Sequence, residues 1–238
     1  MGKIYRYECR RLLWNQFFAG LAAVLLGYGA LVLRGVTILG VSHTAPFSPW
    51  SFGDYLSRML PLLWIGSLFF LTFFTSPKAR RTAALTDAVP MRPARFALAL
   101  CAAAFTGTAI LALLCIVEAA VFYGRMFGWY GWGSLAFPAL VTLLPPLVFA
   151  LGSGWLLGRL RPWLLYIWMV VPLLLAVLPL PEVLGLWNGS FFTAYPLTLE
   201  NLDPTFALPG PMVMVQLLLL MAGMALLVFG SKRRSIPI

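Results

Sequence analysis

Six long apolar stretches dominate this sequence and limit what it can fold into. They lie approximately at residues 14–34, 55–76, 95–123, 135–158, 163–180 and 210–230. A helix needs about 20 mainly apolar residues to cross the hydrocarbon core of a bilayer. The connections between the stretches are too short to hold a soluble domain. The pattern therefore predicts an all-α integral membrane protein in which residues 1–238 form a single transmembrane domain of six helices.

The composition points to the same class of protein. Of the 238 residues, 61% are hydrophobic and 10% are charged, and the mean hydropathy is +0.91. Soluble domains have about 45–50% apolar and about 25% charged residues. The net charge of +10 comes without a basic face or a motif that reads nucleic acid. We therefore attribute it to membrane orientation and to contact with anionic lipid.

The Lys and Arg residues are distributed unevenly between the two ends of the stretches. With the N-terminus placed in the cytoplasm, fourteen of the seventeen fall on the inner side. The inner pieces 1–13, 77–95, 159–162 and 231–238 carry four, five, two and three of them. Cytoplasmic loops of membrane proteins are enriched in Lys and Arg. The distribution therefore predicts six spans with both termini in the cytoplasm.

The inner piece 77–95 reads PKARRTAALTDAVPMRPAR. Its residues 79–88 contain neither Gly nor Pro and include several Ala residues, which favour helix. Pro90 disfavours helical geometry at Val89 and so ends the segment. We therefore expect a short cytoplasmic helix of about two to three turns between the second and third spans. Such a helix is placed to receive a push from a soluble partner. The alternative is a solvated basic loop that only fixes the topology.

Sequence motifs for enzymatic chemistry are absent. No GxxxxGK[ST] segment is present, so the chain does not bind ATP through a P-loop. His43 is the one histidine and no HExxH segment exists, which leaves too few ligands for a zinc protease site. We expect no catalytic, cofactor-binding or metal-binding residues and no enzymatic activity in this chain. Glu118 is the one acidic residue clearly inside a span, fewer than a proton-driven carrier normally uses.

Arg58 and Glu118 are charged residues inside neighbouring predicted spans. At about 1.5 Å per residue, Arg58 lies roughly 27 Å above the cytoplasmic boundary and Glu118 roughly 34 Å. The difference of about 7 Å is within the reach of an Arg side chain combined with helix tilt. Because lone charges at this depth are costly, we predict an intramembrane ion pair. Two alternatives stay open. Each side chain reaches the outer surface separately, or Arg58 pairs with Asp54, four residues earlier.

Small residues recur at a spacing of four in two of the spans. Ala99, Ala103 and Gly107 form such a stripe in the third, and Gly154 and Gly158 form a GxxxG in the fourth. This spacing permits close helix contacts in lipid. The contacts lie either within one subunit or between two.

Three segments, taken in order, are similar to those of one family. Residues 7–12 (YECRRL) place an acidic residue among basic ones before the first span. Arg81-Thr82, Leu85 and Val89-Pro90 follow the second span, and residues 194–197 (AYPL) end an aromatic connection, 181–209, that contains no Lys or Arg. In this order the segments resemble the membrane (permease) subunit of type-2 ABC exporters. The resemblance covers the whole chain, in topology more than in identity.

The resemblance implies a function and a set of partners. The short helix between spans two and three would be the coupling helix that contacts a separate P-loop ATPase subunit, which holds the ATP and Mg. A second permease copy or a related permease would complete the transport path in a bacterial plasma membrane. The residues implied in the ATPase contact are Arg80, Arg81, Thr82, Leu85, Thr86, Asp87, Val89 and Pro90. The alternative is a polytopic protein that does not transport, such as an assembly or immunity factor that binds lipid or peptide.

Overall fold

The computed structural model describes residues 2–76, 93–199 and 204–232. Within these residues the regular elements are all helical. They are α1 (Gly2–Leu13), α2 (Gln16–Gly35), η1 (Thr37–Leu39), α3 (Pro49–Thr75), α5 (Pro93–Phe127), α6 (Gly133–Leu160), α7 (Leu164–Val177), η2 (Glu182–Leu184), α8 (Gly185–Asn188), α9 (Ser190–Ala194), η3 (Tyr195–Thr198) and α10 (Gly210–Lys232).

Five of these helices are long and apolar enough to cross a membrane. They are α2 extended through η1, α3, α5, α6 and α10, taken over the spans Gln16–Leu39, Pro49–Thr75, Arg95–Phe127, Gly133–Leu160 and Gly210–Ser231. The prediction of an all-α multi-pass membrane protein is thus confirmed. Six complete crossings and the side on which the termini lie stay predictions.

The remaining apolar stretch, predicted at 163–180, forms the shorter helix α7. Its 14 residues span about 21 Å at about 1.5 Å per residue, less than the hydrocarbon core of a bilayer. The helix ends because Leu178 is extended, with φ −71° and ψ 143°. Pro179 follows Leu178 in the sequence, and a residue before proline is biased towards this geometry.

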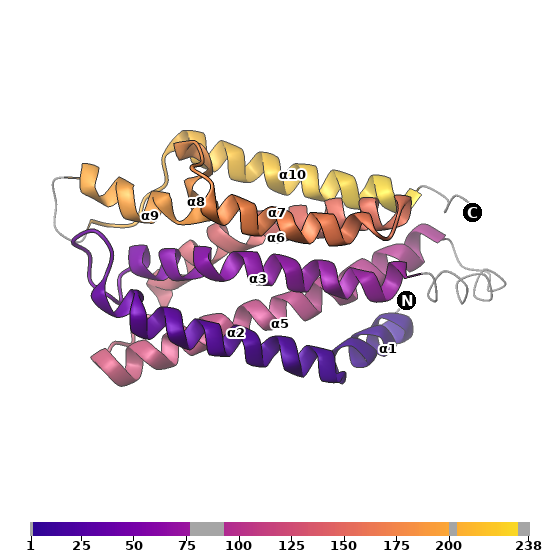
Figure 1. Cartoon of the computed structure of the whole chain (residues 1–238), viewed down its shortest axis with the longest axis horizontal. Helices are drawn as coiled ribbons and strands as arrows, with labels where there is room; N and C mark the ends of the chain where they lie inside the picture. The colour runs from indigo at the N-terminus through magenta and orange to yellow at the C-terminus, as the bar shows by residue number, and fades with distance from the viewer. Residues whose placement is uncertain (1, 77–92, 200–203, 233–238) are drawn as a thin grey trace.

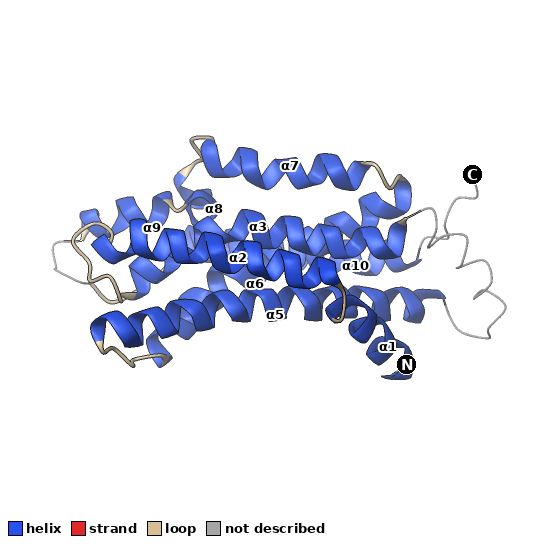
Figure 2. Cartoon of the chain, turned by 60° about the horizontal axis from the view of Figure 1, so that its bottom comes forward, coloured by secondary structure: helices blue, strands red, loops and turns tan. Residues whose placement is uncertain are grey.

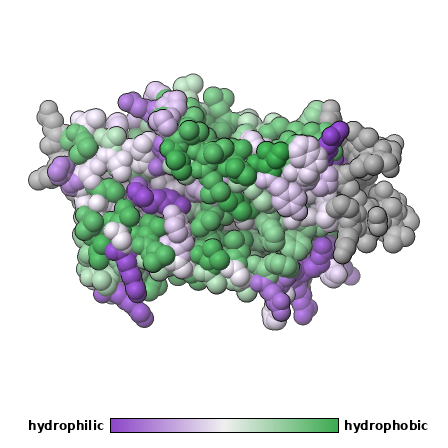
Figure 3. Space-filling model, in the orientation of Figure 1, coloured by the Kyte–Doolittle hydropathy of each residue, from purple (hydrophilic) through white to green (hydrophobic). Residues whose placement is uncertain are grey.

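The long helices run side by side along one axis, and the bundle has two distinct ends (Figure 1). Helix α1 lies at one end, here called the α1 end. The short helices α8 and α9 lie at the other, here called the α8 end. Helix α7 runs parallel to the bundle on its outside (Figure 2). Apolar side chains cover the middle of the surface and hydrophilic ones gather towards the ends (Figure 3), as a protein surrounded by lipid requires.

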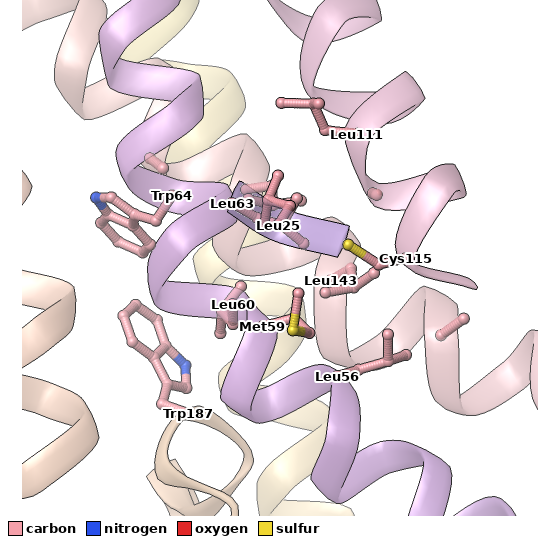
Figure 4. Close-up of a cluster of buried hydrophobic side chains, with 14 of the residues drawn as sticks. Leu25, Leu56, Met59, Leu60, Leu63, Trp64, Leu111, Cys115, Leu143 and Trp187 are labelled. Carbon is pink, nitrogen blue, oxygen red and sulfur yellow. The ribbon is translucent and has the colours of Figure 1, made fainter. Parts of the chain in front are cut away.

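Helix α3 is the centre of the bundle. It packs against α2, α5, α6, α7, α8 and α9. Its side chains meet those of four neighbouring helices in one apolar cluster (Figure 4). The labelled members are Leu56, Met59, Leu60, Leu63 and Trp64 of α3, Leu25 of α2, Leu111 and Cys115 of α5, Leu143 of α6, and Trp187 of α8.

Local sequence sets both ends of α3. The Ser48 side chain accepts a hydrogen bond from the Ser51 backbone N–H, and Pro49 occupies the first turn. Both features are typical of a helix start, because the first backbone N–H groups have no partner within the helix. The helix ends at Thr75, where Ser76 turns extended ahead of Pro77 in the sequence.

The small residues singled out in the sequence make contacts within the subunit. Gly154 faces Leu68 and Leu71 of α3, and Gly158 faces Thr75. Gly107 of α5 faces Leu12 of α1 and Phe70 of α3. These glycines let neighbouring side chains reach the helix backbone, as close packing in lipid requires.

A close approach of two helix backbones, between α6 and α10, was not predicted. A Cβ atom added to Gly223 of α10 would lie 2.7 Å from the backbone N and 2.8 Å from the Cα of Phe149 on α6. A Cβ added to Gly152 would collide with the carbonyl oxygen of Gly223. Because the atoms in the way belong to backbone, no side-chain rotation relieves the clash.

We predict that Gly223→Ala destabilises the protein by about 1–3 kcal/mol, because overpacking forces α6 and α10 apart. Gly27→Ala is the matched control, since a Cβ at Gly27 of α2 meets nothing within 4 Å. Ala is also a better helix former than Gly, so the control should keep or raise stability. Thermal unfolding in detergent measures both. Equal midpoints for the two variants would contradict the close contact.

Candidate functional site

The residues expected to contact an ATPase lie outside the described part of the chain. They are Arg80, Arg81, Thr82, Leu85, Thr86, Asp87, Val89 and Pro90. The described neighbours are the end of α3 at Thr75 and the start of α5 at Pro93. The short helix and its contact therefore stay predictions, and the structure fixes only the two helices that the segment joins.

Helix α1 packs across α5 at the α1 end of the bundle. The Tyr5 hydroxyl lies 2.7 Å from Thr106 Oγ1, and Leu12 is buried against Gly107. Glu8 lies on the same packed face, with its Oε2 3.2 Å from Arg11 Nη1. Burial raises the pKa of the Glu8 carboxyl, and the nearby Arg11 guanidinium opposes that rise. The acidic residue of the segment YECRRL thus faces the protein rather than water.

The opposite face of α1 is basic and aromatic. Its exposed side chains are Lys3, Arg6, Tyr7 and Arg10, and the exposed Trp14 follows directly after the helix. The Arg10 guanidinium lies 5.9 Å from the centre of the Trp14 ring. Basic side chains combined with Trp and Tyr are typical of a helix at a membrane–water boundary.

The predicted ion pair between Arg58 and Glu118 is not formed. Arg58 Nε instead lies 2.8 Å from Asp54 Oδ2, one turn earlier on α3. The physical reason is local geometry, because residues four apart on one helix already face each other, without any demand on the packing of a second helix. The Asp54 side chain is 1% exposed and that of Arg58 is 39% exposed. The arginine therefore neutralises a buried carboxylate while its own side chain reaches the surface.

Glu118 of α5 contacts Tyr55 of α3 and Gly29 of α2. Its Oε2 lies 3.3 Å from the Tyr55 hydroxyl, which also lies 3.2 Å from the Cys115 carbonyl oxygen. A Cβ added to Gly29 would collide with Glu118 Oε2 and lie 2.9 Å from the Tyr55 hydroxyl. Three helices thus meet around one carboxyl group. The sequence drew attention to Glu118, but nothing in it identified Tyr55 or Gly29 as partners.

The connection between α7 and α10 is docked onto α3 at the α8 end. Gly189 has φ +80°, and a Cβ there would lie 2.7 Å from Ser57 Oγ and 2.8 Å from Asp54 Oδ1. Trp50 donates a hydrogen bond of 2.8 Å from Nε1 to the Pro204 carbonyl. The Ser42 hydroxyl donates to the Thr193 carbonyl. The connection therefore covers the end of α3 and lies against the buried Asp54.

The polar side chains inside the bundle form small, separate contacts. The part of the chain that the structure describes holds no group of three or more His, Cys, Asp or Glu residues arranged for a metal ion. Cys101 and Cys115 are buried and free. Asp54 is paired with a cation, Arg58, and Glu118 contacts a phenol, Tyr55.

Neither a protein-family model, nor a curated protein, nor a solved structure matches this chain. The fold defines the class on its own: a helical, multi-pass membrane protein whose described residues include five helices long and apolar enough to cross a bilayer.

We predict different couplings for the two candidate partners of Arg58. Removing Arg58 leaves Asp54 buried without its cation, so Arg58→Ala and Asp54→Ala should be non-additive by about 0.5–3 kcal/mol. Arg58→Ala and Glu118→Ala should be additive within about 0.5 kcal/mol, because the two side chains do not meet. Double-mutant cycles of unfolding in detergent test both. A larger coupling for Arg58 with Glu118 than with Asp54 would contradict the observed pairing.

Proposed function

We propose that this chain is the membrane (permease) subunit of a type-2 ABC exporter, with six crossings, both termini in the cytoplasm and no ATPase of its own. The observation that supports this best is the order of parts around the basic segment 77–95. An amphipathic helix is docked on the bundle before it, and a connection of short helices caps the central helix after it. Two permease subunits and two ATPase subunits would make the working unit, with ATP and Mg held by the ATPases.

The position of α3 gives this proposal a mechanical basis. The segment 77–92 is joined directly to α3, and α3 contacts most of the other helices. If an ATPase displaces this segment, the movement is therefore transmitted first to α3, the helix at the centre of the bundle. At its α1 end that helix touches Gly158 of α6 through Thr75, and at its α8 end it touches Gly189 through Asp54. A rigid shift of α3 would reach both ends of the transport path.

The topology is the first consequence of the proposal. In a variant without native cysteines, a cysteine at Thr198 should react with a membrane-impermeant maleimide added to intact cells. Thr198 is exposed at the α8 end, which the proposal puts outside. A cysteine at Thr82 should react only after the membrane is opened. Labelling of Thr82→Cys in intact cells would overturn the orientation.

The ATPase contact is the second consequence, and it tests the function itself. A P-loop ATPase subunit should copurify with the chain. Leu85→Asp and Val89→Asp should uncouple ATP hydrolysis from transport, because each places a charge in an apolar contact. The matched control is Leu197→Asp, which adds the same charge at an exposed position of the α8 end.

Transport and ATPase stimulation should fall in the first two variants and persist in the control, at equal levels of inserted protein. Normal coupling in both Leu85→Asp and Val89→Asp would count against the docking helix. Absence of any copurifying ATPase from native membranes would overturn the permease function and favour a protein that does not transport.

A further inference from the structure

Glu118 is an acidic residue inside a membrane-spanning helix, nine residues before the end of α5 at Phe127. It is half-buried, and exposed apolar side chains, Leu113, Val117 and Val121, flank it on the same helix. The carboxyl group therefore lies beside lipid-facing surface and not in water. An ionised carboxylate in such surroundings is costly unless a cation neutralises it.

The described residues bring no cation to this carboxyl group. Glu118 belongs to neither of the ion pairs formed by Glu8 with Arg11 and by Asp54 with Arg58. Arg58 is held by Asp54, and Arg125 lies seven residues further along α5, about 10 Å away along the helix axis. The polar and titratable groups that face Glu118 are Tyr55 of α3 and Cys115 of its own helix, while α2 presents Gly29.

With Glu118 ionised, the Tyr55 hydroxyl has one hydrogen to share between two acceptors. The Tyr55 hydroxyl has one hydrogen and lies 3.2 Å from the Cys115 carbonyl oxygen and 3.3 Å from Glu118 Oε2. The carbonyl oxygen can only accept. If the Tyr55 hydrogen goes to the carbonyl, the contact with Glu118 is a hydrogen bond only when the carboxyl donates. Both contacts are satisfied together when Glu118 carries a proton.

Gly29 shows that the fold leaves room for this arrangement. A side chain at Gly29 would occupy the place of Glu118 Oε2 and crowd the Tyr55 hydroxyl. Because Gly29 has no side chain, the Glu118 carboxyl group fits between α2, α3 and α5. Tyr55 is fully buried, so its hydroxyl has no water to replace a lost partner.

We propose that Glu118 is a proton-binding site inside the membrane, occupied at neutral pH, in which the neutral acid donates to Tyr55 and Tyr55 donates to the Cys115 carbonyl. The ligand is the proton itself. Its release would leave a carboxylate against the backbone of α2 with no cation beside it, so proton binding and the packing of α2 on α3 and α5 are linked. The site is independent of the proposed transport function.

The direct test is infrared spectroscopy of the purified protein at neutral pH. Glu118→Gln should remove one C=O stretching band of a protonated carboxylic acid from the wild-type spectrum. Glu182→Gln is the matched control, because Glu182 is exposed on the α7–α10 connection and should lose a carboxylate band instead. Tyr55→Phe should keep the Glu118 acid band but shift its frequency, since the acceptor of its hydrogen bond is gone. Loss of a carboxylate band in Glu118→Gln would overturn the proposal.

A second test needs only the wild-type protein and so does not depend on how a variant folds. A hydrophobic carbodiimide reacts with protonated carboxyl groups in apolar surroundings. The acid proton moves to a carbodiimide nitrogen, and the carboxyl oxygen bonds to the central carbon, with no leaving group. Mass spectrometry of membranes treated at neutral pH should find the adduct on the peptide that contains Glu118. An unmodified Glu118 peptide in folded, membrane-inserted protein would overturn the proposal.

Discussion

The packing of the other helices around α3 is the interaction on which the rest of the structure depends. In lipid, helices gain little from hiding apolar surface, so association rests on close contact and on the pairing of polar groups. Helix α3 has both. Leu56, Met59 and Leu63 are buried among α2, α5 and α6, while Asp54 and Tyr55 carry the polar contacts. Helix α10, by contrast, packs mainly along α6, with close contacts at Gly223 and Gly230, and leaves many of its side chains exposed.

Much of the fold follows from length and hydropathy alone, and the exceptions have local causes. Five predicted spans appear as long apolar helices because an apolar stretch of about 20 residues has few other ways to satisfy its backbone in a bilayer. The predicted stretch 163–180 is shorter as a helix, and Pro179 accounts for its end. The contact between Gly152 and Gly223 could not be predicted from the sequence. It depends on the register of two helices about 70 residues apart, and no pattern within either helix records that register.

The candidate site shows the same division between local and distant information. Asp54 and Arg58 are four residues apart, so their pairing could be read from the sequence, and it stood as an alternative there. Arg58 and Glu118 lie at similar levels along their helices, but a level does not fix the direction in which a side chain points around its helix. The Tyr55–Glu118 contact needs the rotation of α3, α5 and α2 together, which only the packed structure supplies.

Asp54 and Glu118 show two solutions to one problem, that of a carboxyl group away from water. The Asp54 side chain is 1% exposed, and its carboxylate is neutralised by Arg58, whose Nε lies 2.8 Å away on the same helix. Gly189 of the α7–α10 connection packs against this carboxylate. Glu118 has a phenol in place of a cation, and a phenol stabilises the carboxyl best when a proton supplies the missing hydrogen. The first solution holds the α7–α10 connection against α3 through the contact of Asp54 with Gly189. The second, by our proposal, links the packing of α2 to proton binding, because the residue of α2 that faces Glu118 is Gly29, which carries no charge.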